Sequence, residues 1–193
     1  MSVTYIPKGY RSKLNLYETQ LAIGTLKRIF EEHLCKAINL KRVSAPLFVR
    51  ANSGLNDNLN GIERPVAFET KEGGMQAEIV HSLAKWKRLA LHKYGFPAGE
   101  GLYTDMNAIR RDEQMDNIHS IYVDQWDWER VITKEERTVA FLKQIVSDIV
   151  SAICDTYERM RDIFPALDTD ISREVFFITA QQLEDMYRDL TSK

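Results

Sequence analysis

Two stretches of polar residues have the types and spacing that could hold a charged small molecule. In Arg110-Arg111-Asp112-Glu113, two permanently charged, planar guanidinium groups share a turn-like segment, which is an expected place for phosphate binding. Further on, Gln125 and Asp127 alternate with Trp126 and Trp128. An antiparallel strand with one solvated face would have this pattern. The alternative is that something specific is held there, since a core strand does not favour a carboxylate.

Lys87 is a third candidate, because it lies on an otherwise apolar helix face. Ser82 can cap a helix that runs from Leu83 to about Tyr94, and steps of three and four residues place Lys87 beside Leu91. Two interpretations are open. Either the lysine stem packs while its ammonium reaches water, or the charge faces a ligand.

Helices and short strands must position these groups. Hydrophobic periodicity predicts a long helix over residues 14–40 and another from Lys134 to about Met160. Pro46 interrupts a β-rich run over residues 41–48, so this strand is expected at an edge or an interface. The other predicted elements are a hairpin of strands 66–68 and 77–80, a loop from Gly95 to Asn107, a strand over 120–129, a strand at 175–178 and a helix from Gln181 to Leu190.

The composition is that of an ordinary globular chain. Of its 193 residues, 44% are hydrophobic and 28% are charged, and the net charge of −2 gives no electrostatic reason to expect a nucleic acid or membrane partner. The apolar runs are too short for a membrane span, and the amino terminus lacks the apolar core of a signal peptide. The length fits a single domain over residues 1–193. Cys35 and Cys154 both lie in helical patterns, which fits the reducing cytoplasm.

Four long strings identify a family resemblance. They are "NDNLNGIERPV" (56–66), "VHSLAKWKR" (80–88), "GLYTDMNAIRRDE" (101–113) and "HSIYVDQWDWERV" (119–131). Together they resemble the ammonia-dependent asparagine synthetase family, the aspartate–ammonia ligases. The similarity covers essentially the whole chain and is strongest over residues 42–137.

The resemblance implies a fold, which is an α/β (α+β) core like that of class II aminoacyl-tRNA synthetases. An antiparallel sheet would be flanked by helices, in a homodimer. The long first helix and the strand with Pro46 resemble the first class II motif, at the dimer interface. The strands and charged turn around Arg110 resemble the second motif, which holds the nucleotide.

The resemblance also implies a two-step reaction that uses ATP and Mg²⁺. The side-chain carboxylate of aspartate attacks the α-phosphorus of ATP, giving β-aspartyl-adenylate and pyrophosphate. Ammonia then attacks the activated carbonyl and releases asparagine and AMP. The protein must hold two anions together and stabilise charge at phosphorus, which requires positioning and electrostatics.

Eight residues match the family's site positions. Lys87 would face a substrate carboxylate and Arg110 the α-phosphate, so these two are the expected catalytic residues. Carboxylate and amide oxygens would accept hydrogen bonds from the substrate's amino group. The expected aspartate-binding residues are Asp57, Ser82, Lys87, Gln125 and Asp127; the expected nucleotide-binding residues are Arg110, Glu113 and Ser120; none is a metal ligand.

The sequence departs from the family at its end, because family members continue well past Lys193. The remainder would carry the acidic metal-binding strand and the third class II motif, so we expect the chain alone to be nearly inactive. Two alternatives to the ligase stay open: a non-catalytic paralogue that dimerises or binds an amino acid or nucleotide, and a relative of asparaginyl- or aspartyl-tRNA synthetases. The roles of His81 and His119 are open as well.

Overall fold

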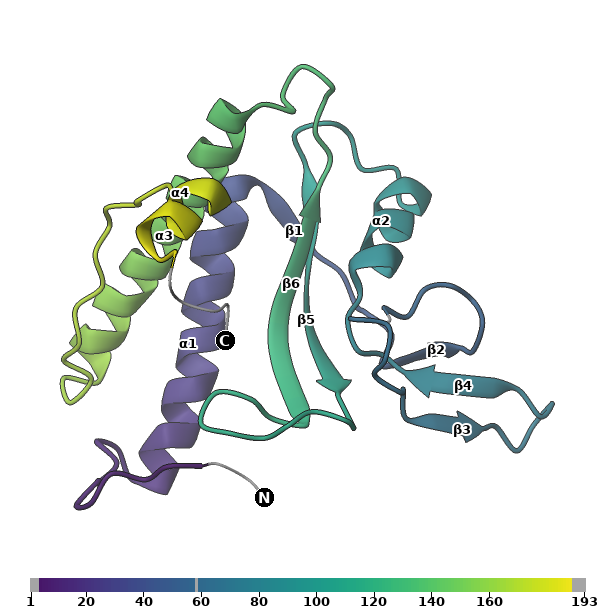
Figure 1. Ribbon diagram of the computed structural model, residues 1–193, viewed down its shortest axis with the longest axis horizontal. Coiled ribbons are helices and arrows are strands. Elements are labelled where there is room, and N and C mark those ends of the chain that lie inside the picture. Colours follow the sequence, from purple (N-terminus) through teal and green to yellow (C-terminus); the bar gives the residue numbers. More distant parts are fainter. Residues whose placement is uncertain (1–3, 58, 189–193) are drawn as a thin grey trace. The chain divides into compact units, whose positions relative to one another are not determined.

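The structure is a computed structural model that describes residues 4–57 and 59–188. Within these ranges, helices and short strands mix along the chain (Figure 1), which confirms the predicted α/β (α+β) class. The chain divides into two units, Met1–Asn15 with Ile38–Lys134 and Leu16–Ala37 with Glu135–Lys193. The single domain over residues 1–193 stays a prediction.

The central strand of the first unit is β5 (Gly101–Ile109). It pairs in parallel with β1 (Leu40–Arg42) and antiparallel with β6 (Tyr122–Arg130). The β5–β6 register is continuous from Gly101↔Arg130 to Ile109↔Tyr122. The two strands therefore lead directly into and out of the charged turn, and the predicted strand over 120–129 is confirmed.

The predicted loop from Gly95 to Asn107 is wrong over its second half. Gly95 and Gly99 do lie in turns, with φ of +70° and +86°, but Gly101 begins β5. A Cβ at Gly101 would lie 2.4 Å from the carbonyl oxygen of Glu129 and 2.6 Å from Cδ2 of Leu40. This glycine therefore permits close packing of strands and does not make a turn.

A second small sheet contains the confirmed hairpin. β3 (Ala67–Glu69) and β4 (Gln76–Ile79) are antiparallel, and β2 (Phe48–Arg50) pairs with the other side of β4. The run over residues 41–48, predicted as one strand, forms parts of β1 and β2 instead. Pro46 lies between them, where its missing N–H costs no ladder hydrogen bond.

Helix α2 (Ala84–Lys93) buries the predicted apolar face. Leu83, Ala90 and Leu91 are buried, and the latter two pack with Leu102 of β5. The predicted cap is wrong: the N-cap residue is Leu83, with no side-chain cap hydrogen bond. The Ser82 hydroxyl donates to a carboxylate in a neighbouring loop, and its oxygen accepts only a long bond, at 3.5 Å, from the N–H of Ala84.

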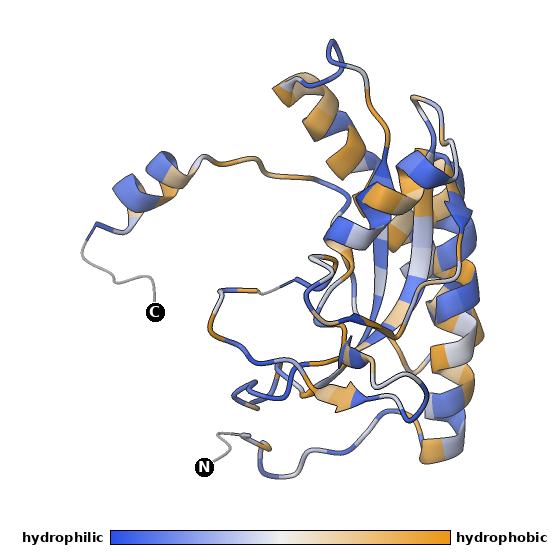
Figure 2. Cartoon of the chain, turned by 90° about the vertical axis from the view of Figure 1, so that its right-hand side faces the viewer, coloured by the Kyte–Doolittle hydropathy of each residue, from blue (hydrophilic) through white to orange (hydrophobic). Residues whose placement is uncertain are grey.

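The second unit contains α1 (Leu16–Ile38, whose last residue belongs to the first unit), α3 (Val139–Ile163) and α4 (Ala180–Met186). Thr138 caps α3, and hydrophobic and hydrophilic bands mix along the helices (Figure 2). The predicted strand at 175–178 is wrong, because these residues have no ladder partner in the described part of the chain. Leu190, the predicted end of the last helix, lies outside the described residues.

Gly101→Ala is expected to lower the free energy of unfolding by about 2 kcal/mol, because two of the three clashing atoms belong to the β6 backbone. Urea unfolding would measure it. Gly24→Ala is the matched control: a Cβ on this α1 glycine meets nothing within 4 Å, so the same change should stabilise by up to about 1 kcal/mol. Shifts of the same sign in both variants would contradict this explanation.

Candidate functional site

Lys87 forms a buried ion pair between α2 and β6. Only 2% of its side chain is exposed, and its ammonium pairs with the carboxylate of Asp127 and donates to the carbonyl of Trp128 at 3.0 Å. The Glu129 carboxylate lies 3.9 Å from the same nitrogen. The interpretation in which the ammonium reaches water is therefore wrong, and the charge is satisfied inside the fold.

Strand β6 presents its polar groups as the alternation predicted. Residues two apart on a strand project from the same face, and Asp127 and Glu129 both reach Lys87. Gln125, two residues earlier, donates to the sulfur of Met106 at 3.5 Å. Glu129 was not among the predicted site residues, although its place on the same face was a usable signal.

Asp57 is held by the start of α2. Ser82 Oγ donates to Asp57 Oδ2 at 2.7 Å, and Lys85 Nζ lies 3.9 Å from Oδ1. The residue before it, Asn56, is buried and accepts from the backbone N–H of His81 at 2.9 Å. The structure therefore brings the predicted residues Asp57 and Ser82 together, through a loop and a helix start that are 25 residues apart.

The two histidines whose roles were open have different environments. His81 is 1% exposed, and its Nδ1 lies 3.1 Å from the carbonyl of Asp57. Because a carbonyl only accepts, Nδ1 carries the proton. His119 lies in the turn, with Nδ1 2.9 Å from Asp116. The N–H of Ile118, and then His119, hold the pKa of Asp116 below its usual range.

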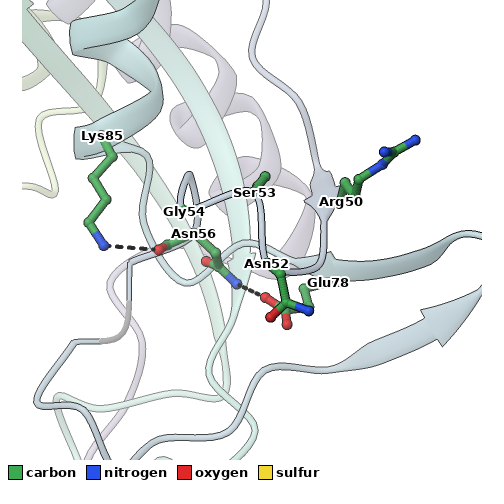
Figure 3. A pocket seen from close by; sticks show the side chains of 7 residues that line it. All are labelled: Arg50, Asn52, Ser53, Gly54, Asn56, Glu78 and Lys85. Carbon is green, nitrogen blue, oxygen red and sulfur yellow. Dashed lines mark hydrogen bonds between the residues drawn. The ribbon is translucent and has the colours of Figure 1, made fainter.

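A polar cavity of about 280 Å³ adjoins the Asp57 loop (Figure 3). Lys85 donates to the carbonyl of Asn56 at 3.4 Å, and the Asn56 amide donates to Glu78 at 3.3 Å. The Arg50 side chain points away from this group in Figure 3. The lining of the cavity includes none of the predicted site residues. It consists of Arg50, Asn52, Ser53, Gly54, Asn56, Glu78 and Lys85.

The charged turn presents a guanidinium with spare donor capacity. Arg110 begins the turn, where its N–H donates to the carbonyl of Ile121 at 2.8 Å. Its Nη1 lies 4.0 Å from Glu113 Oε2. Its buried Nε has no hydrogen-bond partner among the described residues. Because a buried N–H without a partner is costly, this atom suits an anionic ligand. Ser120 is exposed beside Ile121, at the end of the same turn.

Two features are absent from the described residues. No set of three or more His, Cys, Asp or Glu side chains there could hold a metal ion. Over the same residues, no helix has the length and apolar character needed to cross a membrane.

Comparisons with known proteins agree on one family. The family model described as aspartate–ammonia ligase matches residues 17–193. An aspartate–ammonia ligase of Clostridium tetani is 60% identical over 189 residues, which are 97% of this chain and 55% of the relative. One from Bacillus cereus is 54% identical over 184 residues, 95% of this chain and 56% of the relative. The chain spans about half the length of the curated relatives it matches.

A solved structure, asparaginyl-tRNA synthetase from Pyrococcus horikoshii complexed with asparaginyl-adenylate, overlaps 75% of this chain and 30% of its own. The TM-score is 0.47 and the identity 16%, which is too low to carry any residue's role to this chain. The family model and the relatives suffice by themselves. By both, the chain belongs to the aspartate–ammonia ligase family.

Proposed function

We propose that this chain supplies the aspartate-binding and nucleotide-binding side of an ATP-dependent asparagine synthetase. The side-chain carboxylate of aspartate attacks the α-phosphorus of ATP, which gives β-aspartyl-adenylate and releases pyrophosphate. Ammonia then attacks the activated carbonyl, and asparagine and AMP leave. A carboxylate is a poor acyl donor, so its activation is the step that consumes ATP.

The buried Lys87–Asp127 pair is the observation that carries this proposal. Free aspartate is a zwitterion with an ammonium group and two carboxylates, so it can replace each half of that pair. A carboxylate would bind Lys87, and the ammonium would donate to Asp127, Gln125 and Asp57. The Asp127 side chain keeps 23% of its surface exposed, which leaves the anionic half within reach of solvent.

Arg110 is the proposed contact for the α-phosphate. Its buried Nε lacks a partner within the described ranges, and a guanidinium fork binds phosphate oxygens in pairs. Glu113, near Nη1 of Arg110, would orient the guanidinium, and Ser120 would lie by the nucleotide. Mg²⁺ would be bound together with the ATP phosphates, as this ion commonly is.

A homodimer in the cytoplasm completes the proposal. The first turns of α1 expose apolar side chains that a partner could cover, since Leu16 is 89% exposed, Tyr17 73% and Leu21 48%. Measurement of the molar mass in solution would test the dimer.

The full gene product that carries this chain is expected to make asparagine, AMP and pyrophosphate in equal amounts from aspartate, ATP, Mg²⁺ and ammonium. The products separate the possible routes, because activation through an acyl phosphate would give ADP. A relative that only binds amino acids would bind aspartate but release neither pyrophosphate nor ADP. ADP formation, or pyrophosphate release that needs no aspartate, would contradict the proposal.

Arg110→Ala should slow aspartate-dependent exchange of pyrophosphate into ATP by about a hundredfold or more, the usual cost of one transition-state donor. Stability should hardly change, because the side chain has little internal bonding to lose. Arg50→Ala is the matched control: among the described residues its guanidinium has no side-chain partner, so this change also removes few internal contacts. Near-normal exchange by Arg110→Ala would remove this residue from the site.

The two halves of the buried pair should differ in their effect on stability. Asp127→Ala leaves the Lys87 side chain, which is 2% exposed, without its main partner, and should cost about 3 kcal/mol. Lys87→Met leaves the Asp127 side chain, which is 23% exposed and can be solvated, so the cost should be smaller. Calorimetric titration of aspartate into each of the two variants should detect no binding. A greater loss of stability in Lys87→Met would contradict this account of the pair.

A further inference from the structure

Arg64 holds Asp112 through three hydrogen bonds. Its Nε donates to Oδ2 at 2.9 Å, its Nη2 donates to Oδ1 at 2.6 Å, and its backbone N–H donates to Oδ2 at 2.9 Å. The guanidinium fork thus grips both carboxylate oxygens, and the backbone bond fixes the carboxylate in a third direction. We call these contacts the Arg64–Asp112 clamp.

The clamp joins the two segments that carry the proposed ligand contacts. Arg64 lies in the loop between β2 and β3, seven positions after Asp57. Asp57 belongs to the same loop and is held by Ser82. Asp112 lies in the turn between β5 and β6, between Arg110 and Glu113. The joined residues are 48 positions apart in sequence, so the clamp is a tertiary contact.

Both ends of the clamp have further hydrogen bonds beside them. In the loop, the Glu63 carboxylate accepts from the backbone N–H and the side-chain amide of Asn60, each at 3.0 Å. In the turn, the backbone N–H of Glu113 donates to the carbonyl of Arg110 at 3.1 Å. Arg111 adds a weaker tie, from Nη1 to the carbonyl of Pro65 at 3.5 Å. A movement of Asp112 would therefore displace its neighbours on both sides.

The charges favour a persistent contact. Arg64, together with Arg111 at 3.8 Å, holds the pKa of the Asp112 carboxyl well below its usual range, and Asp112 raises the pKa of Arg64. Because the folded pKa of Asp112 is depressed, its contribution is complete above the ordinary value of about 3.9 and is lost only in stronger acid. Exposed ion pairs usually contribute little, but a bidentate arginine fork is the exception.

We propose that Arg64 is a positioning residue for the nucleotide subsite. Through Asp112 it fixes the turn so that Arg110 and Glu113 face the phosphate, and it ties this turn to the loop that carries Asp57. The nucleotide assignment rests on the proposed function, whereas the mechanical role of the clamp does not.

The remainder of the turn has its own supports, which makes the effect local. Asn117 exchanges two hydrogen bonds with the backbone of Tyr5, at 2.8 and 2.7 Å. Asp116 accepts from the N–H groups of Ile118 and His119 at 2.8 and 2.9 Å. Loss of Arg64 should therefore loosen residues 110–113 and leave residues 116–119 in place.

The test compares Arg64→Ala and Arg64→Lys in the full gene product with Arg42→Ala. The control breaks the exposed ion pair between Arg42 and Asp105, whose Nη2 and Oδ1 atoms are 2.9 Å apart. This pair lies on the sheet, away from the turn. Amide hydrogen exchange over 110–113 should speed up about tenfold in Arg64→Ala. It should speed up less in Arg64→Lys, which keeps the charge without the fork, and not at all in Arg42→Ala. Exchange in β5 and β6 should not change.

Kinetics supply the second readout. The KM for ATP in pyrophosphate exchange should rise about tenfold in Arg64→Ala, while the KM for aspartate changes less than about threefold, since one broken charge-assisted contact is worth roughly a factor of ten. The double variant Arg64→Asp with Asp112→Arg should recover part of the loss.

The outcomes separate the two proposals. Unchanged exchange over 110–113 in Arg64→Ala would overturn the clamp as a positioning device. Faster amide hydrogen exchange together with equal increases in the KM for ATP and the KM for aspartate would overturn the specific role of Arg64 at the nucleotide subsite. So would faster amide exchange with no change in either KM. A wild-type protein without aspartate-dependent pyrophosphate exchange would instead refute the proposed function, and the hydrogen-exchange result would still decide the mechanical role.

Discussion

A lysine with 2% of its side chain exposed must be matched by an anion, and the first unit is organised around that requirement at Lys87. α2 supplies the cation on its apolar face, so β6 has to present a carboxylate at one position along its length. Asp127 does so only in the observed register, opposite Thr104 of β5. A shift by one residue would turn Asp127 to the other face and leave the lysine unpaired.

That register in turn depends on close packing at the start of β5. Gly101 lies where the backbone of β6 and the side chain of Leu40 leave no room for a Cβ. The sheet can therefore close at this corner, and the pairing continues to Ile109 and the charged turn. The position of Arg110 thus follows from packing that begins nine residues earlier along the same strand.

The proposed binding groups outside the sheet lie on loops that polar contacts hold in place. The Asp57 loop is held by Ser82 and His81 at one side and by the clamp to Asp112 at the other. Loops carry function most effectively when a rigid scaffold fixes them. Here the fastening groups are themselves charged or polar, so the same kinds of side chain shape the site and would serve its ligands.

The sequence by itself determined the local elements, the family and the candidate residues. The strand around Asp127, the apolar face around Lys87 and the β3–β4 hairpin are short-range patterns that the structure confirms. Gly101 was misinterpreted as part of a loop, because the sequence does not distinguish a glycine needed for tight packing from one needed for a turn.

Only the tertiary structure decided which charges meet. Lys87 and Asp127 are 40 positions apart, and Arg64 and Asp112 are 48. Neither pairing has a local signature, because it depends on strand register and on how a helix or a loop packs against the strands. For the same reason, Lys87 has a partner inside the fold, whereas its place in the sequence was compatible with an ammonium in water.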